Sequence, residues 1–353
     1  MTRTRITAAW AKAVNRGMAE LRRTASDSAR QIVKSAFNSA RPSRPRKQRS
    51  PPEGDWLPGL VTGVGGALRF RLYRPPQLKA LERLPLVVML HGCRQDADEF
   101  AAVTRMNRLA LKERFCVLYP EQSGLANPQR CWNWFDTDSG RAFAEADLIL
   151  NALEQVCQLH PLDRERVLVA GLSAGASLAA LMALRQPKSF QGVVMHSGIP
   201  PGTAHSTLTA MAAMRGRRTT PPLVAAPQGA PLDLPALLVI HGNADTTVSP
   251  SNARAAAVIW AEAAGAKESA PRQVQRGKRY PMSVTEFKCQ GDTVVTLVTL
   301  AGLGHAWSGG APGHPFSDAH GPDASRMVWA FAKRLFRGPV AEGAVPPGGT
   351  PQG

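Results

Sequence analysis

The alternation of short apolar runs with longer segments of helical periodicity constrains the fold of this sequence more than any other feature. The runs predicted as buried strands are Leu86–Leu90, Cys116–Tyr119, Val167–Ala170, Gly192–His196 and Leu237–His241. The segments predicted as helices are 98–113, 142–158, 174–185, 251–264 and 323–336. Strands that alternate with helices favour an α/β fold, with a mostly parallel central sheet covered by helices on both faces.

Two regions depart from this alternation. Segments 283–289 and 293–300 flank Gln290-Gly291-Asp292, which predicts a hairpin near the edge of the sheet. Residues 201–234 are rich in Pro, Gly, Ala and Thr and follow neither period, so we expect an irregular insertion over the site. The sequence has no run of 18 apolar residues, and it therefore predicts no transmembrane helix.

The positive charge of the chain is concentrated at its N-terminus. Of the net +17, residues 1–50 contribute +11, with 13 Lys and Arg against two acidic residues. Trp10, Val14 and Leu21 recur near helical spacing there, which predicts a basic amphipathic helix. Such a helix fits a polymer granule or an anionic membrane surface as partner. The body carries little net charge, so nucleic acid is not predicted as a partner.

The pentapeptide Gly171-Leu172-Ser173-Ala174-Gly175 is the sharpest local signal of chemistry. It follows the apolar run Val167–Ala170 and precedes a stretch that favours a helix. A serine on a tight turn from strand to helix needs small neighbours, because its strained backbone leaves no room for bulk. Ser173 is therefore the predicted nucleophile.

A serine hydroxyl needs a general base, and the base needs an acid to orient it. On this type of turn the chain order is serine, then Asp or Glu, then His, each after a strand. Asp245 follows the strand-like run Leu237–His241, and His305 follows the run 294–300. These two residues are the predicted acid and base.

Other residues of the same types remain as alternatives. His91 and His241 each begin a His-Gly turn after a strand, which favours a role in shaping those turns. His314 and His320 lie beyond His305 and fit the surface. Two further acids, Asp233 and Asp292, are weaker candidates, since neither follows a clear parallel strand.

The oxyanion of a tetrahedral intermediate needs hydrogen-bond donors. One predicted donor is the backbone N–H of Ala174, directly after the nucleophile, and the other is that of Cys93, in the loop after Leu86–Leu90. The substrate-binding candidates are aromatic or follow a strand: Trp132, Trp134, Trp307 and His196. Dense aromatics are also typical of a core, so a structural role for the tryptophans stays open. The five cysteines form no CxxC pair, so no zinc site is predicted, and the chemistry requires no metal or organic cofactor.

Together these segments resemble the poly(3-hydroxybutyrate) depolymerase family of esterases, which has the α/β-hydrolase fold. The matching segments are LHGCRQDADEF (90–100), RCWNWF (130–135), VLVAGLSAGASLAALMA (167–183), HSGIPPG (196–202), HGNADTTVSP (241–250) and GLGHAWSGG (302–310). The resemblance implies a Ser173–Asp245–His305 triad, oxyanion donors at Cys93 and Ala174, and a Cys93–Cys131 disulfide.

Composition and the extent of the resemblance divide the chain into three parts. We expect a basic N-terminal extension and Pro-rich linker over 1–55, an α/β-hydrolase catalytic domain over 56–337, and a disordered Gly- and Pro-rich tail over 338–353. Secreted polymer-degrading relatives carry a signal peptide, and charged residues such as Lys12 and Arg16 interrupt every apolar window here. A cytoplasmic location is therefore favoured, although related members are extracellular.

The predicted function is hydrolysis of carboxylic esters, with short-chain hydroxyalkanoate esters or oligomers as the substrates. Feruloyl and acetylxylan esterases share the fold and the turn chemistry and remain alternatives. A hypothesis of another class makes the chain a granule- or membrane-binding protein that acts through its basic N-terminus.

Overall fold

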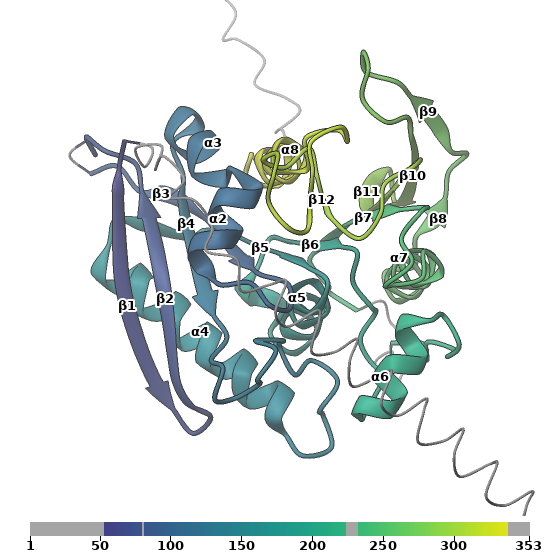
Figure 1. Ribbon diagram of the computed structural model, residues 1–353. Helices are drawn as coiled ribbons and strands as arrows, with labels where there is room; N and C mark the ends of the chain where they lie inside the picture. The colour runs from purple at the N-terminus through teal and green to yellow at the C-terminus, as the bar shows by residue number, and fades with distance from the viewer. Residues whose placement is uncertain (1–52, 80, 224–231, 338–353) are drawn as a thin grey trace, which may run out of the picture. The chain divides into compact units, whose positions relative to one another are not determined.

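A central sheet of 11 strands organises the protein (Figure 1). The computed structural model describes residues 53–79, 81–223 and 232–337. The strands of the sheet are β1 (Asp55–Gly63), β2 (Gly66–Arg74), β3 (Leu84–Leu90), β4 (Cys116–Glu121), β5 (Leu162–Leu172), β6 (Gly192–His196), β7 (Ala236–Gly242), β8 (Lys267–Glu268), β9 (Arg272–Val274), β10 (Met282–Cys289) and β11 (Asp292–Leu300). Their spatial order is β1-β2-β4-β3-β5-β6-β7-β11-β10-β8, and β9 also pairs with β10.

The remaining elements lie between and around these strands. The helices are α2 (Ala97–Thr104), α3 (Met106–Glu113), α4 (Arg141–Leu159), α5 (Ala174–Arg185), α6 (Thr207–Met214), α7 (Ser251–Ala263) and α8 (Ala324–Phe336), with a 3₁₀ turn η1 (Pro187–Ser189). A separate parallel pair joins β12 (Trp307–Ser308) to β13 (Ser317–Asp318).

The middle of the sheet is parallel. Strands β4, β3, β5, β6, β7 and β11 pair side by side in one direction, whereas β1 and β2 on one side and β10 on the other are antiparallel to their neighbours. The predicted α/β class is thus confirmed, and so is the hairpin near the sheet edge, formed by β10 and β11. Because parallel strands end at the same edge, the loops after β3, β5, β7 and β11 lie close together.

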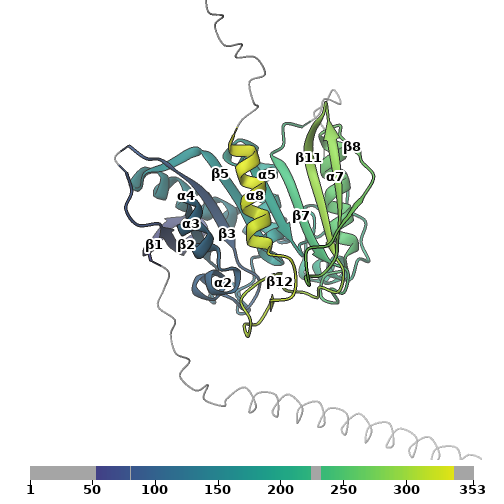
Figure 2. The same cartoon turned by 90° about the horizontal axis from the view of Figure 1, so that it is seen from above.

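Two apolar layers, one on each face of the sheet, form the core. Along β3, Leu86, Val88 and Leu90 pack into one layer, and Val87 and Met89 pack into the other, as the alternation of side chains along a strand requires. Helices α4, α5 and α7 contribute to the first layer, and α2, α3 and α8 to the second (Figure 2). Burial on both faces explains why these strands have continuous apolar runs in the sequence.

The segment predicted as one helix over 98–113 is two helices in the structure. Arg105 separates α2 from α3 with a left-handed backbone, φ 55°. Contacts with a distant loop hold this break, since the Arg105 guanidinium donates to the carbonyl of Gly309 and the Ala311 N–H donates to that of Val103. Tertiary contacts of this kind leave no trace in local periodicity.

Other parts of the fold were not predicted from the sequence. The β1–β2 hairpin closes one edge of the sheet, and its strand β1 begins at Asp55. Within the region expected to be irregular, α6 begins at a capping box formed by Ser206 and Thr209. Among residues 53–79, 81–223 and 232–337, no helix has the length and apolarity that crossing a bilayer requires.

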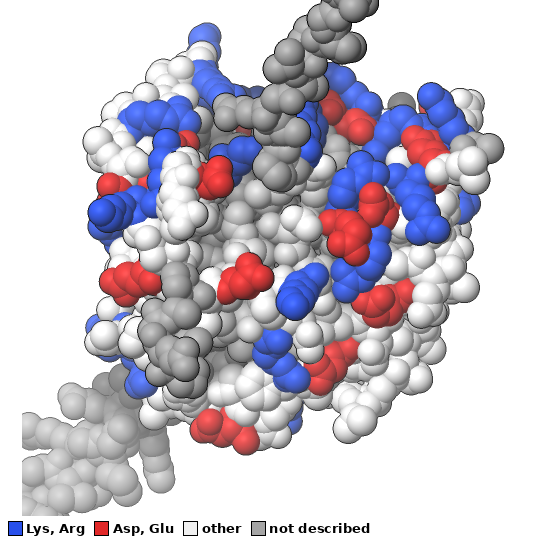
Figure 3. All heavy atoms as spheres, turned by 180° about the vertical axis from the view of Figure 1, so that it is seen from behind, with Lys and Arg blue, Asp and Glu red and all other residues white. Residues whose placement is uncertain are grey.

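The predicted N-terminal helix, most of the linker and the C-terminal tail lie outside the described residues. The surface of the described part has mixed charge on the face that Figure 3 shows, where Lys and Arg side chains lie among Asp and Glu side chains. Several charged side chains of the described part form ion pairs, such as Arg254 with Glu268 and Arg164 with Glu154.

A buried aromatic pair, formed by Phe115 before β4 and Trp329 of α8, provides a test of the core. Phe115 is fully buried and stacks on Trp329 with 3.9 Å between ring centroids. We expect Phe115→Ala to lower the free energy of unfolding by about 3–5 kcal/mol, because the truncation leaves a cavity. Urea unfolding measures this loss. Leu125→Ala is the control, since Leu125 is fully exposed; equal stability of the two variants would contradict the assigned packing.

Candidate active site

Ser173 lies on the turn between β5 and α5. Its backbone has φ 56° and ψ −118°, a conformation that L-residues rarely adopt. The Ser173 N–H donates to the carbonyl of His196 at the end of β6 (2.8 Å), and the Ser173 carbonyl accepts from the Ser177 N–H (3.1 Å). The strained turn is therefore fixed from both sides, and the side chain lies at the carboxyl edge of the sheet.

Two glycines make this turn possible. A Cβ on Gly171 would lie 2.3 Å from the carbonyl carbon of Gly175, so strand and helix touch at backbone distance. A Cβ on Gly175 would lie 2.2 Å from the carbonyl oxygen of Leu90 and 2.6 Å from that of His91. The same glycine therefore brings the first turn of α5 against the loop that follows β3.

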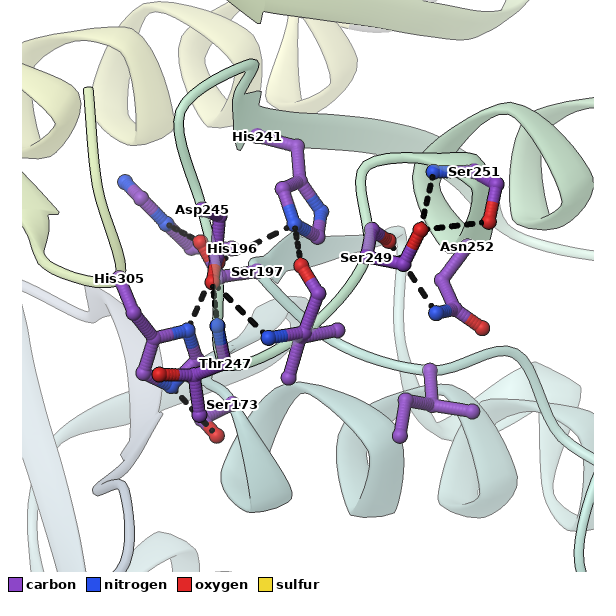
Figure 4. Close-up of polar contacts among 12 residues, drawn as sticks. Ser173, His196, Ser197, His241, Asp245, Thr247, Ser249, Ser251, Asn252 and His305 are labelled. Carbon is purple, nitrogen blue, oxygen red and sulfur yellow. Dashed lines mark hydrogen bonds and ion pairs between the residues drawn. The ribbon is translucent and has the colours of Figure 1, made fainter. Parts of the chain in front are cut away.

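A continuous chain of hydrogen bonds joins Ser173 to His305 and Asp245 (Figure 4). The Ser173 Oγ lies 3.0 Å from His305 Nε2, and His305 Nδ1 lies 2.7 Å from Asp245 Oδ2. A carboxylate can only accept, so Nδ1 carries the proton and Nε2 presents its lone pair to the serine hydroxyl. This geometry lets His305 remove the proton of Ser173.

Asp245 is buried and fully hydrogen-bonded. Its Oδ1 accepts from the backbone N–H groups of Thr247 and Val248, both at 2.9 Å, and its Oδ2 accepts from His305 and lies 3.2 Å from His241 Nε2. Burial alone raises the pKa of Asp245, but the hydrogen bonds from His241 and His305 outweigh it and hold that pKa well below its usual value. The carboxylate is therefore ionised throughout the neutral range.

Backbone contacts fix the loops that carry Asp245 and His305 against each other. The Asn243 N–H donates to the carbonyl of Leu300 (2.9 Å), and its side-chain oxygen accepts from the Gly302 N–H (2.8 Å). The Ala244 N–H donates to the carbonyl of Leu303 (3.1 Å). A Cβ on Gly242 would lie 2.0 Å from that same Leu303 oxygen, so only glycine permits this approach.

Two backbone N–H groups beside Ser173 have no acceptor among the described residues. They belong to Cys93 and Ala174, the predicted oxyanion donors. Ala174 is the first residue of α5, where N–H groups have no partner within the helix. Gly92 packs beside Leu172, which places the two donors on neighbouring loops. Within the described residues neither N–H group is used by the fold, which leaves both open to a ligand oxygen.

Covalent and polar contacts hold the loop that carries Cys93. Cys93 is joined to Cys131 by a disulfide, the pairing that the family resemblance implies. The Trp132 Nε1 donates to the carbonyl of His91 (3.1 Å), and the Gln122 N–H donates to His91 Nε2 (3.0 Å). Burial lowers the pKa of His91 to about 4, so its ring stays neutral and acts as a fixed acceptor.

A buried carboxyl group that sequence reasoning missed supports this region. Glu145 of α4 accepts from the Asn133 N–H (2.8 Å) and from the Gln122 side chain (2.7 Å). The Gln122 side chain also donates to the carbonyl of Cys131. Burial raises the pKa of Glu145 despite these bonds. The only sequence signal for Glu145 is an acidic residue on the apolar side of a predicted helix.

The aromatic candidates are placed differently from the sequence expectation. Trp132 and Trp307 are fully buried, and Trp134 is 9% exposed. Trp307 packs edge-on against Phe100 and donates from Nε1 to Ser325 Oγ (3.1 Å). These side chains belong to the core and support the loops from beneath, so the predicted role as a pocket wall is corrected to the structural alternative.

His196 is also buried, and it packs inside the protein instead of facing solvent. It is fully buried, stacks on Trp307, and accepts at Nε2 from the Ser308 N–H (3.2 Å). Burial, and then the nearby His241 and His305, lower the pKa of His196 to about 3. His196 therefore stays neutral and braces the segment that follows His305, which corrects its predicted contact with substrate.

Three of the competing candidates lie at the surface of the protein. His320, Asp233 and Asp292 are exposed, and His320 also pairs with Asp318. His241 contacts Asp245 and Val248, so it lies inside the site although it was assigned only to a turn. In the described part of the chain, no group of three or more His, Cys, Asp or Glu is placed to hold a metal ion.

The chain is similar in sequence to several known proteins. Residues 68–270 match the family described as esterase PHB depolymerase. The chain is 31% identical over 243 residues to poly(3-hydroxyalkanoate) depolymerase C of Paucimonas lemoignei, a match that covers 67% of this chain and 57% of that protein. It is 26% identical over 236 residues to a probable acetylxylan esterase A of Aspergillus clavatus, covering 62% of this chain and 74% of the relative.

Solved structures share the fold. An acetyl xylan esterase from Aspergillus awamori superposes with a TM-score of 0.58 at 20% identity and covers 78% of this chain and 99% of its own. A structure from an analysis of two Rhizomucor miehei esterases gives a TM-score of 0.52 at 17% identity, covering 87% and 90%. At these identities the likeness shows the fold alone, which is the α/β-hydrolase fold.

The packing of Gly175 predicts a large effect from one methyl group. We expect Gly175→Ala to lower stability by about 1–3 kcal/mol, because the new Cβ overlaps the carbonyl oxygens of Leu90 and His91. Helix propensity works in the opposite direction, by about 1 kcal/mol. Thermal unfolding measures the net change. Gly304→Ala is the control, since its Cβ meets nothing within 4 Å; a Gly175→Ala protein as stable as this control would refute the close packing.

Proposed function

Because the chain belongs to the esterase PHB depolymerase family, we propose that it hydrolyses carboxylic esters through an acyl-enzyme on Ser173. The observation that carries this proposal is the hydrogen-bonded chain from Ser173 Oγ through His305 to the buried Asp245. The match covers 57% of the length of the depolymerase relative. The activity is therefore proposed from the geometry of this protein, and the substrate from its family and relatives.

Acylation begins when Ser173 Oγ attacks the ester carbonyl carbon. His305 Nε2, 3.0 Å from that oxygen, takes its proton. The charge that then develops on the imidazole is stabilised by Asp245 Oδ2, 2.7 Å from Nδ1. The tetrahedral oxyanion accepts from the N–H groups of Cys93 and Ala174, and a donor of this kind lowers the barrier by about 2.7–4 kcal/mol.

Acylation ends when the alcohol leaves, and deacylation repeats the same steps with water. His305 first returns the proton to the alcohol oxygen, the bond between that oxygen and the acyl carbon breaks, and the alcohol leaves. Water then attacks the acyl carbon as His305 accepts its proton. His305 returns that proton to Ser173 Oγ as the bond between Oγ and the acyl carbon breaks, and the acid leaves. Every group in the cycle belongs to the chain, the substrate or water.

We assign short-chain hydroxyalkanoate esters or oligomers as the substrates. This assignment is supported by the family match and by the depolymerase relative. A second candidate is an acetyl ester of a carbohydrate, which acetylxylan esterases among the relatives favour. Parallel rates on 3-hydroxybutyrate oligomers, acetylated xylo-oligosaccharides and feruloyl esters decide between them.

Removal of the nucleophile tests the proposed chemistry. We expect Ser173→Ala to lower kcat for p-nitrophenyl butyrate by a factor on the order of 10⁶, because only binding and the oxyanion donors remain. The variant should stay folded and should not react with a fluorophosphonate probe. Ser251→Ala, at an exposed serine of α7, is the matched control and keeps full activity. Strong labelling of Ser173→Ala would place the nucleophile elsewhere.

A surface-binding role is assigned to residues 1–50, which lie outside the described residues. Support comes from their net charge of +11 and from Trp10, Val14 and Leu21 at helical spacing. Each basic residue near an anionic surface contributes about 1 kcal/mol, and salt screens this attraction over a distance of about 10 Å at 0.1 M. The segment would hold the esterase at an anionic granule or membrane surface.

Deletion of residues 1–50 separates binding from hydrolysis. Because Ser173, Asp245 and His305 lie in the described body, we expect hydrolysis of soluble esters to stay within about threefold of full length. Sedimentation with anionic vesicles or polymer granules should be lost, and full-length binding should weaken as salt rises. Deletion of 338–353 removes no Lys or Arg and serves as control. Full-length protein that binds neither surface at low salt would contradict the assignment.

A further inference from the structure

His241 lies against the carboxylate of Asp245 on the side away from Ser173. It is the second-last residue of β7, four residues before Asp245, and both side chains are buried. His241 Nε2 lies 3.2 Å from Asp245 Oδ2 and 3.0 Å from the carbonyl oxygen of Val248 (Figure 4). The ring therefore joins the beginning of the loop that carries Asp245 to its end.

The neighbours of this ring fix its tautomer. A carboxylate oxygen and a carbonyl oxygen are both acceptors, so Nε2 must carry the proton and donate. Asp245 Oδ2 therefore has two N–H groups near it: it accepts from His305 Nδ1 at 2.7 Å, and the His241 Nε2–H, which donates to Val248, also lies 3.2 Å from it. Since Oδ1 already accepts from Thr247 and Val248, the carboxylate is held at both oxygens.

The other nitrogen of the His241 ring shows that shape alone does not explain the residue. His241 Nδ1 is buried and has no hydrogen-bond partner, the one such side-chain atom among the described residues. A buried polar atom without a partner is costly, and an apolar side chain of similar size would fill the same space without this cost. The benefit of a histidine here must come from Nε2, which faces Asp245 and Val248.

We infer that His241 is a positioning residue for the ester hydrolysis, which acts through Asp245 by holding Oδ2 ionised and directed at His305 Nδ1. The inference rests on the proposed function. Without this donor, a buried Oδ2 has one N–H in place of two and can satisfy itself by turning away or by taking up a proton. Either change weakens the support of the imidazolium that forms as Ser173 attacks. Substrate binding does not involve this carboxylate, so the loss falls on kcat and leaves KM unchanged.

A matched pair of amide variants isolates the donor at Nε2. In His241→Gln the amide nitrogen lies near the position of Nε2 and can donate to Asp245, whereas in His241→Asn it lies near Nδ1, where no acceptor is present. We expect His241→Asn and His241→Leu to lower kcat for p-nitrophenyl butyrate at least tenfold, with KM within twofold of wild type. His241→Gln should restore most of kcat. Thermal unfolding of each variant identifies losses that come from folding.

A double-mutant comparison identifies the route of the effect. If His241 acts through Asp245, His241→Leu should slow fluorophosphonate labelling of Ser173 about tenfold in the wild-type background and less than twofold in Asp245→Asn. Equal slowing in both backgrounds overturns the inference, and so does an equal kcat for His241→Gln and His241→Asn. If all three variants unfold, His241 serves stability alone and the inference also fails. Wild-type protein that neither labels nor hydrolyses esters refutes the proposed function instead.

Discussion

The site depends on the close approach of three backbone segments around Gly175. The first turn of α5 touches the end of β5 at Gly171 and the loop after β3 at Leu90 and His91. These contacts place Ser173 in its strained conformation and set the N–H groups of Cys93 and Ala174 on adjacent loops. A side chain at either glycine would separate these segments, so Ser173 and the N–H groups of Cys93 and Ala174 depend on the same few contacts.

Aromatic residues of the apolar core hold the backbone around these contacts in place. Trp132 supports the His91 carbonyl, and Trp307 stacks on His196, whose own carbonyl accepts from the Ser173 N–H. Buried aromatic side chains thus fix backbone atoms of the site without contact with a substrate.

The sequence predicted most of the sheet and the chain order of the site, for physical reasons. Buried parallel strands have continuous apolar runs, and the strand–turn–helix context of Ser173 requires small residues at 171 and 175. The strands that close the sheet edge were not found, because β1 is half exposed and contains Pro58 and Gly59. The break at Arg105 and the network of Glu145 depend on partners far along the chain, which local patterns do not contain. The burial of Trp132 and Trp307 was left open for the same reason, since aromatic density fits both a core and a pocket.

The depth of burial also distinguishes four histidines of this region, His91, His196, His241 and His305. His91 and His196 are completely buried, and burial lowers their pKa values to about 4 and 3, so both rings are neutral at pH 7 and serve as fixed acceptors for backbone N–H groups. His241 faces two acceptors and therefore presents an N–H to Asp245. His305 contacts both Ser173 and Asp245, and its side chain keeps 11% of its surface exposed. One residue type thus supplies acceptors, a donor and a proton carrier, and the depth of each ring and the partners at its two nitrogens determine which.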